Sequence, residues 1–263
     1  MITLDGSHGW VISYTNKHNI SGKVVEDINK GDWTFCTSIQ PEWNPNQLIL
    51  NIDNKGYRGG VLVRNGMHSG IFNVLWPSED GKEWLKFIKG EIWYDTPEGK
   101  TEIAMLDKRV FGNGWIDITL SYDRKNRKLT FSTREIGQEW EVQEMEINGE
   151  IIDYSGSHVW IGCANGFESC PEPQFYSGNI RALGVFNSVL SVKDRDKFYK
   201  EYHEFRGIPK YFRSNAHKRQ VYNFEKMNPL AFTNFKTKTA YKAFDFSGNG
   251  NHPIIYKREW GVY

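Results

Sequence analysis

Short stretches in which apolar and polar residues alternate recur along residues 1–190, and this pattern restricts the chain to a fold built from β-strands. The stretches are rich in aromatic and β-branched residues, and Gly, Asn, Asp and Pro separate them at short intervals. The clearest hairpin joins residues 115–122 to residues 128–132 through a polar turn at 123–127. The other predicted strands are residues 10–14, 33–39, 48–52, 60–64 and 70–76.

One segment has the pattern of a helix. Ser191 offers an N-cap oxygen three residues before Asp194. Aromatic residues then recur at helical spacing, namely Phe198, Tyr199 and Tyr202. We therefore predict one short helix over residues 191–205 in an all-β, antiparallel sandwich, because many strands without alternating helices exclude a parallel α/β fold.

The length of 263 residues fits one large sandwich domain. We expect residues 1–206 to form the main sandwich, and residues 207–263 to complete it or pack on it, because a segment this short cannot bury a core of its own. Lys and Arg total 33 against 32 for Asp and Glu, so the net charge of +1 gives no reason to expect nucleic acid as a partner. No apolar stretch approaches the roughly 20 residues that span a bilayer, and we expect no membrane partner.

The N-terminal residues and the cysteines bear on where the protein works. Residues 1–6 lack the basic and apolar regions of a signal peptide, which predicts a cytoplasmic protein, one exported by a non-classical route, or one displayed on a virion. The three cysteines, Cys36, Cys163 and Cys170, have no Cys-x-x-Cys spacing, so neither a disulfide framework nor a zinc site is indicated. Reduced thiols are the simplest reading, and a link between Cys163 and Cys170 is the alternative.

The order of six segments resembles that of the laminin G-like, concanavalin A-like jelly-roll domains. Residues 4–11 are similar to the opening strand of that family, and residues 114–123 are similar to the signature strand before its hairpin. The other matching segments are residues 32–41, 158–162, 175–180 and 185–191. The resemblance extends over residues 2–202 and implies a jelly-roll β-sandwich with glycans as the ligand class.

Two segments that resemble the start of such domains lie near the C-terminus here. Residues 243–252, with the sequence AFDFSGNGNH, are similar to the family's turn before its first motif, and residues 221–225 are similar to its usual first strand. We predict a circularly permuted order, because domain termini often lie close together and a cut in a loop preserves the packing. A second domain that stops after its first strands is the alternative.

The same resemblance implies a structural calcium ion held in this C-terminal turn. Asp245, Asn249 and Asn251 offer the carboxylate and amide oxygens that Ca²⁺ prefers. The alternative is that these side chains stabilise the turn through hydrogen bonds to the backbone. An acidic pair typical of the family is replaced by Arg181 and Ala182, which removes one expected ligand. We expect no required cofactor, with calcium as the one candidate.

A glycan site needs exposed aromatic planes and a few polar groups that bind hydroxyls. Aromatic residues are 15% of the chain, and several lie in or beside residues 77–99, which we expect to be irregular. The candidate ligand-binding residues are Trp76, Trp84, Trp93, Tyr94, Asp80 and Asp95. Packing at the ends of strands is the alternative role for each of them.

Glycoside hydrolysis in a sandwich of this kind would require paired carboxylates on one face of a strand. Glu91 and Asp95 share a face by period two, but Glu98 falls on the other face and Pro97 interrupts the strand. This departs from the compact acidic motif of the glycoside hydrolases that share the fold. We therefore predict no enzyme activity, with a glycoside hydrolase or polysaccharide lyase as the alternative.

The sequence thus predicts a non-catalytic recognition or adhesion module that binds a glycan or a cell-surface polysaccharide. A competing hypothesis is a structural protein of a phage particle, such as a tail-fibre, head-fibre or decoration component, whose partners are other virion proteins. The two overlap, because a virion appendage can bind glycans. We also expect an oligomer or a part of an assembly.

Overall fold

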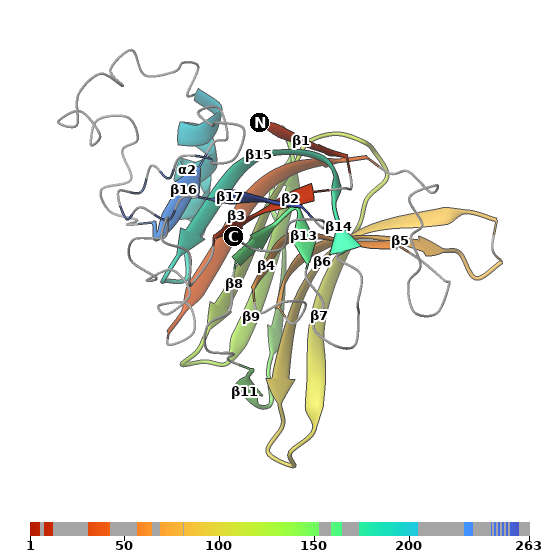
Figure 1. Ribbon diagram of the computed structural model, residues 1–263. Helices are drawn as coiled ribbons and strands as arrows, with labels where there is room; N and C mark the ends of the chain where they lie inside the picture. Colours follow the sequence, from red (N-terminus) through yellow and green to blue (C-terminus); the bar gives the residue numbers. More distant parts are fainter. Residues whose placement is uncertain are drawn as a thin grey trace.

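The computed structural model describes residues 1–5, 8–12, 31–42, 57–64, 69–80, 82–152, 159–164, 174–204, 229–233, 243, 245, 247, 249, 251 and 253–257 (Figure 1). These residues form two antiparallel sheets, a short two-stranded sheet and one helix. The predicted all-β sandwich is therefore confirmed. No helix in the described part of the chain is long and apolar enough to cross a membrane.

The smaller of the two main sheets has seven strands. Six follow one another in the order β1, β15, β3, β8, β9 and β10, and β16 also pairs with β15. Their bounds are β1 Ile2–Asp5, β15 Ser177–Phe186, β3 Trp33–Pro41, β8 Ile116–Asp123, β9 Lys128–Glu135, β10 Glu141–Glu146 and β16 Ala231–Thr233.

The larger sheet has eight strands, in the order β11, β6, β5, β4, β12, β2 and β17, with β7 also paired to β6. Their bounds are β11 Glu150–Ile151, β6 Trp84–Asp95, β5 Ser69–Pro77, β4 Tyr57–Arg64, β12 Val159–Ile161, β2 His8–Ile12, β17 Ile254–Lys257 and β7 Thr101–Arg109. The two-stranded sheet pairs β13 (Cys163–Ala164) with β14 (Gln174–Phe175).

Most of the predicted elements are present. The predicted hairpin is formed by β8 and β9, and the carboxylate of Asp123 accepts a hydrogen bond of 2.9 Å from the backbone N–H of Asn126 in its turn. The helix, α2, spans Val192–Glu204, and Ser191 accepts a 3.2 Å bond from the N–H of Asp194 as the predicted cap. The predicted strand at residues 48–52 lies outside the described residues.

The expectation of an irregular segment at residues 77–99 is wrong. Residues 84–95 form β6, the longest strand of the larger sheet. Its inward positions, such as Ile88 and Ile92, are fully buried, and it pairs with β5 on one side and β7 on the other. The strand pattern is obscured in the sequence because apolar residues also lie on the outer face, namely Leu85, Phe87 and Trp93, so apolar and polar residues do not alternate cleanly.

The core between the two sheets is built from residues that alternate along each strand. Leu120 and Phe131 of the smaller sheet pack against β6, where Gly90 lets the sheets approach closely. A Cβ at Gly90 would lie 2.7 Å from Leu120 and 2.8 Å from Phe131. Glycine is therefore needed at this position for a close contact between the sheets.

The helix α2 covers part of the smaller sheet on the side opposite this core (Figure 1). Phe198 and Tyr199 of α2 are fully buried there against Cys36, Phe186 and Phe232. Phe198 meets the rings of Phe186 and Phe232 edge-on, at 5.8 and 5.7 Å between centroids. This second cluster attaches the one described helix to the sandwich.

The C-terminal segment contributes one strand to each main sheet. β16 pairs with β15 in the smaller sheet, and β17 pairs with β2 in the larger sheet. The strands β16 and β17 therefore extend the two sheets that the earlier residues build. Circular permutation itself stays a prediction, and residues 221–225 lie outside the described residues.

Candidate functional site

The register of β6 decides which of the predicted ligand-binding residues share a face. Ile88 and Ile92 point into the core, so the odd-numbered residues of β6 lie on the opposite, outer face of the larger sheet. Trp93 and Asp95 are on this outer face. Tyr94 is on the core side and is only 9% exposed, so it does not accompany Trp93.

The hairpin of β5 and β6 carries the two exposed tryptophans of the predicted site. Trp76 is 43% exposed and pairs with Leu85, whereas Trp84 is 39% exposed and pairs with Pro77. Residues directly opposite each other share a face, so Trp76 lies on the outer face and Trp84 on the other. The hairpin extends away from the body of the sandwich in Figure 1, which accounts for exposure on both of its faces.

Asp80 lies in the turn of this hairpin and is engaged there. Its carboxylate accepts hydrogen bonds from the Ser78 hydroxyl at 2.6 Å and from the Lys82 backbone N–H at 3.2 Å. Both bonds lower the pKa of Asp80, and the bond from Ser78 has the larger effect. The geometry gives Asp80 a role in the turn.

The other predicted residues lie at the far end of β6. The Tyr94 hydroxyl donates to Glu102 at 2.7 Å, which raises the pKa of Tyr94, and Asp95 accepts a 2.7 Å bond from the Thr101 hydroxyl. Leu85, opposite Trp76, is eight residues from Trp93, or about 27 Å along the strand. The structure therefore separates the six predicted residues into two groups.

Between these groups, the outer face of β6 and β7 carries residues that the sequence analysis missed. Ile103 and Met105 of β7 are 48% and 42% exposed, and they pair with Trp93 and Glu91. Lys89 donates to the Met105 sulfur at 3.3 Å. On neighbouring β5 the same face is covered, because Phe72 is fully buried. Residues 103–106 are all apolar, so no alternation in the sequence marked this open face.

The outer face does not match the carboxylate geometry of a glycoside hydrolase. Glu91 is 4% exposed and Asp95 is exposed, and the two residues are four positions apart, which puts their Cα atoms about 13 Å apart along the strand. Retaining enzymes need roughly 5–5.5 Å between the two groups, and inverting enzymes roughly 6.5–9.5 Å. This pair therefore does not suit either mechanism, and the absence of catalysis stays a prediction.

The C-terminal turn uses its predicted calcium ligands in hydrogen bonds. One oxygen of Asp245 accepts the N–H groups of Phe232 and Ser247, both at 2.9 Å, and the other accepts the Asn251 N–H at 2.8 Å and the Ser247 hydroxyl at 2.7 Å. The side-chain amides of Asn249 and Asn251 both donate to the Leu230 carbonyl. These bonds favour the backbone-stabilising alternative, and calcium stays a prediction.

The described cysteines are buried free thiols. Cys36 and Cys163 are both fully buried. Burial raises the pKa of Cys36 to about 12 and also raises that of Cys163. Neither is therefore an activated nucleophile near neutral pH. Cys170, and with it the alternative of a link to Cys163, lies outside the described residues.

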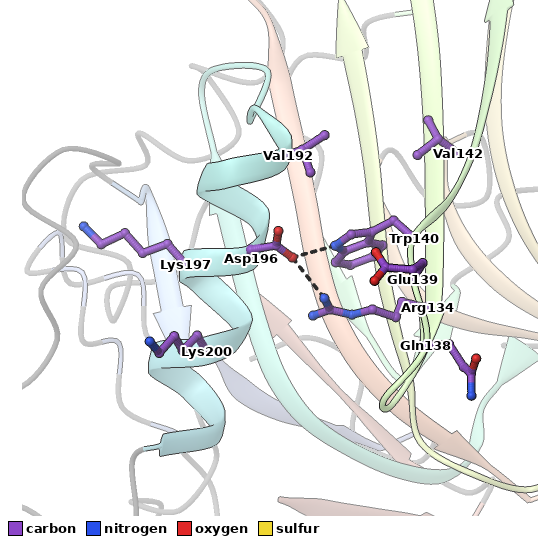
Figure 2. Close-up of a pocket in the computed structure, with 9 residues that line it drawn as sticks. All are labelled: Arg134, Gln138, Glu139, Trp140, Val142, Val192, Asp196, Lys197 and Lys200. Carbon is purple, nitrogen blue, oxygen red and sulfur yellow. Dashed lines mark hydrogen bonds and ion pairs between the residues drawn. The ribbon is translucent and has the colours of Figure 1, made fainter.

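An open hollow lies between α2 and the turn that joins β9 to β10 (Figure 2). Asp196 points from α2 toward this turn, where it accepts 2.7 Å and 2.9 Å bonds from the Trp140 indole and the Arg134 guanidinium. Arg134 also lies 3.3 Å from Asp117, which is 1% exposed. The other lining residues are Gln138, Glu139, Val142, Val192, Lys197 and Lys200.

The aromatic ring at this hollow is already in contact with other side chains. Arg134 lies 4.3 Å from the centre of the Trp140 ring, and the Tyr199 ring lies 5.4 Å away. The Trp140 ring and its polar neighbours thus form their contacts and hydrogen bonds with one another. These contacts attach α2 to the sheet. The outer face of β6 is the better candidate for an external ligand.

Comparison with known proteins places these features in context. No protein-family model matches the chain, and no curated protein sequence is similar to it. The chain is similar in structure to a putative carbohydrate-binding protein from Bacteroides ovatus, at 11% identity and a TM-score of 0.46, over 100% of this chain and 62% of that one.

Two further solved structures are similar over part of the chain. One is the CBM40 of the Ruminococcus gnavus IT-sialidase, at 16% identity and a TM-score of 0.42, over 73% of this chain and 92% of that one. The other is tailspike protein 2 of bacteriophage CBA120, at 12% identity and a TM-score of 0.43, over 66% of this chain. The match spans 24% of that chain, which is the enzymatically active domain of the tailspike. Identities at this level transfer no function, and membership of the laminin G-like family stays a prediction.

Proposed function

We propose that this protein is a non-catalytic recognition module that binds an extended glycan on the outer face of β6. The observation that carries the proposal is that Trp76 of β5 and Trp93 of β6 lie on the same outer face. Trp76 is beside the start of β6, and Trp93 is near its end. The separation of about 27 Å suits a polysaccharide chain better than a single sugar.

The residues between the two tryptophans have the chemistry that a glycan requires. Sugar rings pack on aromatic planes, and their hydroxyls bind charged and polar side chains. Lys89, Asp107 and Arg109 lie on the same face, as pairing partners or strand neighbours of the residues between Trp76 and Trp93. Asp107 and Arg109 are exposed, so their polar groups are open to a ligand.

The test is binding of the purified chain to a glycan array, followed by titration with the best glycan. Trp76→Ala and Trp93→Phe are expected to weaken that binding at least tenfold, because each changes an aromatic plane on the outer face. Trp84→Ala is the matched control, since it removes a similarly exposed tryptophan of the same hairpin from the other face. Equal losses in Trp76→Ala and Trp84→Ala would overturn the assignment to the outer face, and no binding to any glycan would overturn the function.

The proposal also predicts that a bound glycan is recovered intact. Glu91→Gln and Asp95→Asn are expected to leave the ligand's chain length unchanged, as does the wild-type protein, when the ligand is analysed after prolonged incubation. Cleavage by the wild-type protein that either variant abolishes would establish the hydrolase or lyase alternative.

A place in a phage particle, with other virion proteins as partners, stays a prediction. The exposed apolar residues of β7 favour an assembly role of some kind. Such a role does not exclude glycan binding, because pairing at the edge of β7 uses its backbone groups and Trp76 lies far from that edge. Ile103 of β7 is nevertheless the direct neighbour of Trp93 on the outer face.

A further inference from the structure

Among the described residues, the strand β7 has a free edge over residues 101–105. β7 pairs with β6, and no other described strand pairs with it (Figure 1). The Val110 N–H and the Lys100 carbonyl, which flank β7, bond toward β6. Neighbouring residues of a strand point their backbone groups to opposite sides, so those of Thr101, Ile103 and Met105 point to the free edge.

The far end of the same edge is already occupied. The Gln143 side chain of β10 donates to the Asp107 carbonyl at 2.7 Å, and Glu141 of β10 forms an ion pair with Lys108. This contact confirms that odd-numbered backbone groups of β7 face the edge. It also limits the open part to residues 101–105.

The open part has no proline and no bulge, and its one charged side chain, Glu102, is bound to the Tyr94 hydroxyl on the opposite face of the strand from Ile103. Edge strands are normally shielded by charged side chains, proline or a bulge. Here the outer-face side chains at the open edge are Thr101, Ile103 and Met105, and the latter two are 48% and 42% exposed. Two large apolar side chains beside unpaired backbone groups favour pairing with another strand.

We propose that a second copy of this chain occupies the edge, with β7 paired antiparallel to β7 across a two-fold axis at Ile103. In this register Ile103 faces Ile103, and Thr101 of each copy faces Met105 of the other. The edge-directed groups of these three residues then form on the order of six backbone hydrogen bonds. The exposed apolar side chains pack against one another across the axis.

The charges of the strand are compatible with this register. Glu102 lies opposite Ala104 of the second copy, and Glu98 comes near Lys108 of the second copy, so no like charges face each other. A closed two-fold dimer also removes the free edge, and therefore does not propagate into a fibre. The two sheets become continuous through β7.

The test is the mass of the purified chain, measured by light scattering and sedimentation over a range of concentrations. The wild-type protein is expected to be a dimer, and Ile103→Lys a monomer, because it places two ammonium groups together on the axis. Val189→Lys is the control, since Val189 is 41% exposed on another part of the surface. A wild-type monomer at every concentration, or a dimer in Ile103→Lys, overturns the proposal.

Two further variants separate loss of pairing from loss of folding. Ile103→Pro removes an edge-directed N–H, which β7 does not use with β6, and is expected to give a folded monomer by circular dichroism. Ile103→Cys is expected to form a covalent dimer on oxidation, because paired residues at the axis lie within disulfide range. Val189→Cys controls for the native cysteines, and equal cross-linking in both variants counts against the proposal. Trp76→Ala is expected to stay dimeric, so this result is independent of glycan binding.

Discussion

The guanidinium of Arg134 lies 4.3 Å from the centre of the Trp140 ring, and both side chains donate to Asp196 of α2. Residues from the smaller sheet and the helix thus meet in one cluster of stacked and hydrogen-bonded groups (Figure 2). Arg134 also reaches the buried Asp117. This cluster connects the helix to the sheet beside the apolar contacts of Phe198 and Tyr199.

Removing the carboxylate of this cluster is expected to destabilise the protein moderately. Asp196→Ala leaves the Trp140 indole without its acceptor and is expected to lower the free energy of unfolding by about 1–2 kcal/mol, since Asp196 is partly exposed. Urea unfolding measures the change. Glu139→Ala, at an exposed neighbour, is expected to cost less than about 0.5 kcal/mol. Equal effects in the two variants would show that the cluster contributes little.

A buried asparagine in β5 predicts a stabilising substitution. Asn73 is fully buried, and neither its amide nitrogen nor its oxygen has a hydrogen-bond partner among the described residues. Burial of an unpaired amide costs about 1–3 kcal/mol, so Asn73→Leu is expected to raise the free energy of unfolding by about 1 kcal/mol. Asn73→Asp is expected to lower it strongly. A destabilised Asn73→Leu variant would indicate a bound water or another partner for the amide.

The buried thiols predict a loss of stability at alkaline pH. Burial raises the pKa of Cys36 from 9.0 to about 12 in the folded protein, so the unfolded chain loses this proton first as the pH rises. The stability is therefore complete below pH 9.0 and falls above it, by up to about 1.4 kcal/mol per pH unit for each such thiol. Melting temperatures between pH 8 and 10.5 should fall less steeply in Cys36→Ala. An unchanged slope in that variant would exclude Cys36 as a source.

The hydrogen bonds of Asp245 predict that its role does not depend on calcium. Asp245→Ala removes the carboxylate that accepts the buried N–H groups of Phe232 and Asn251, and is expected to cost about 3 kcal/mol of stability. The loss should be equal in calcium and in chelator, as measured by thermal unfolding. If calcium raises the melting temperature of the wild-type protein and not that of Asp245→Ala, the carboxylate is a metal ligand.

Local patterns in the sequence were sufficient to predict several elements of the fold. The strands β3, β8 and β9 and the capped helix α2 follow from alternation, turn residues and an N-cap, which depend on neighbours in the chain. Most of the strand β6 was missed, because Leu85, Phe87 and Trp93 place apolar side chains on its outer face and disturb the alternation. Local pattern also could not show whether the six predicted ligand-binding residues lie together in one site.

The sequence by itself thus determined the sandwich class and the segments able to pair, because side-chain period and turn chemistry are local properties. Only the tertiary structure decided that Trp76 and Trp93 share a face that excludes Trp84, since that depends on the register between β5 and β6. It likewise decided that Gln143 of β10 binds the Asp107 carbonyl, whereas no described strand pairs with β7 at Ile103. Register and edge exposure arise from contacts between residues distant in sequence, and no single segment carries that information.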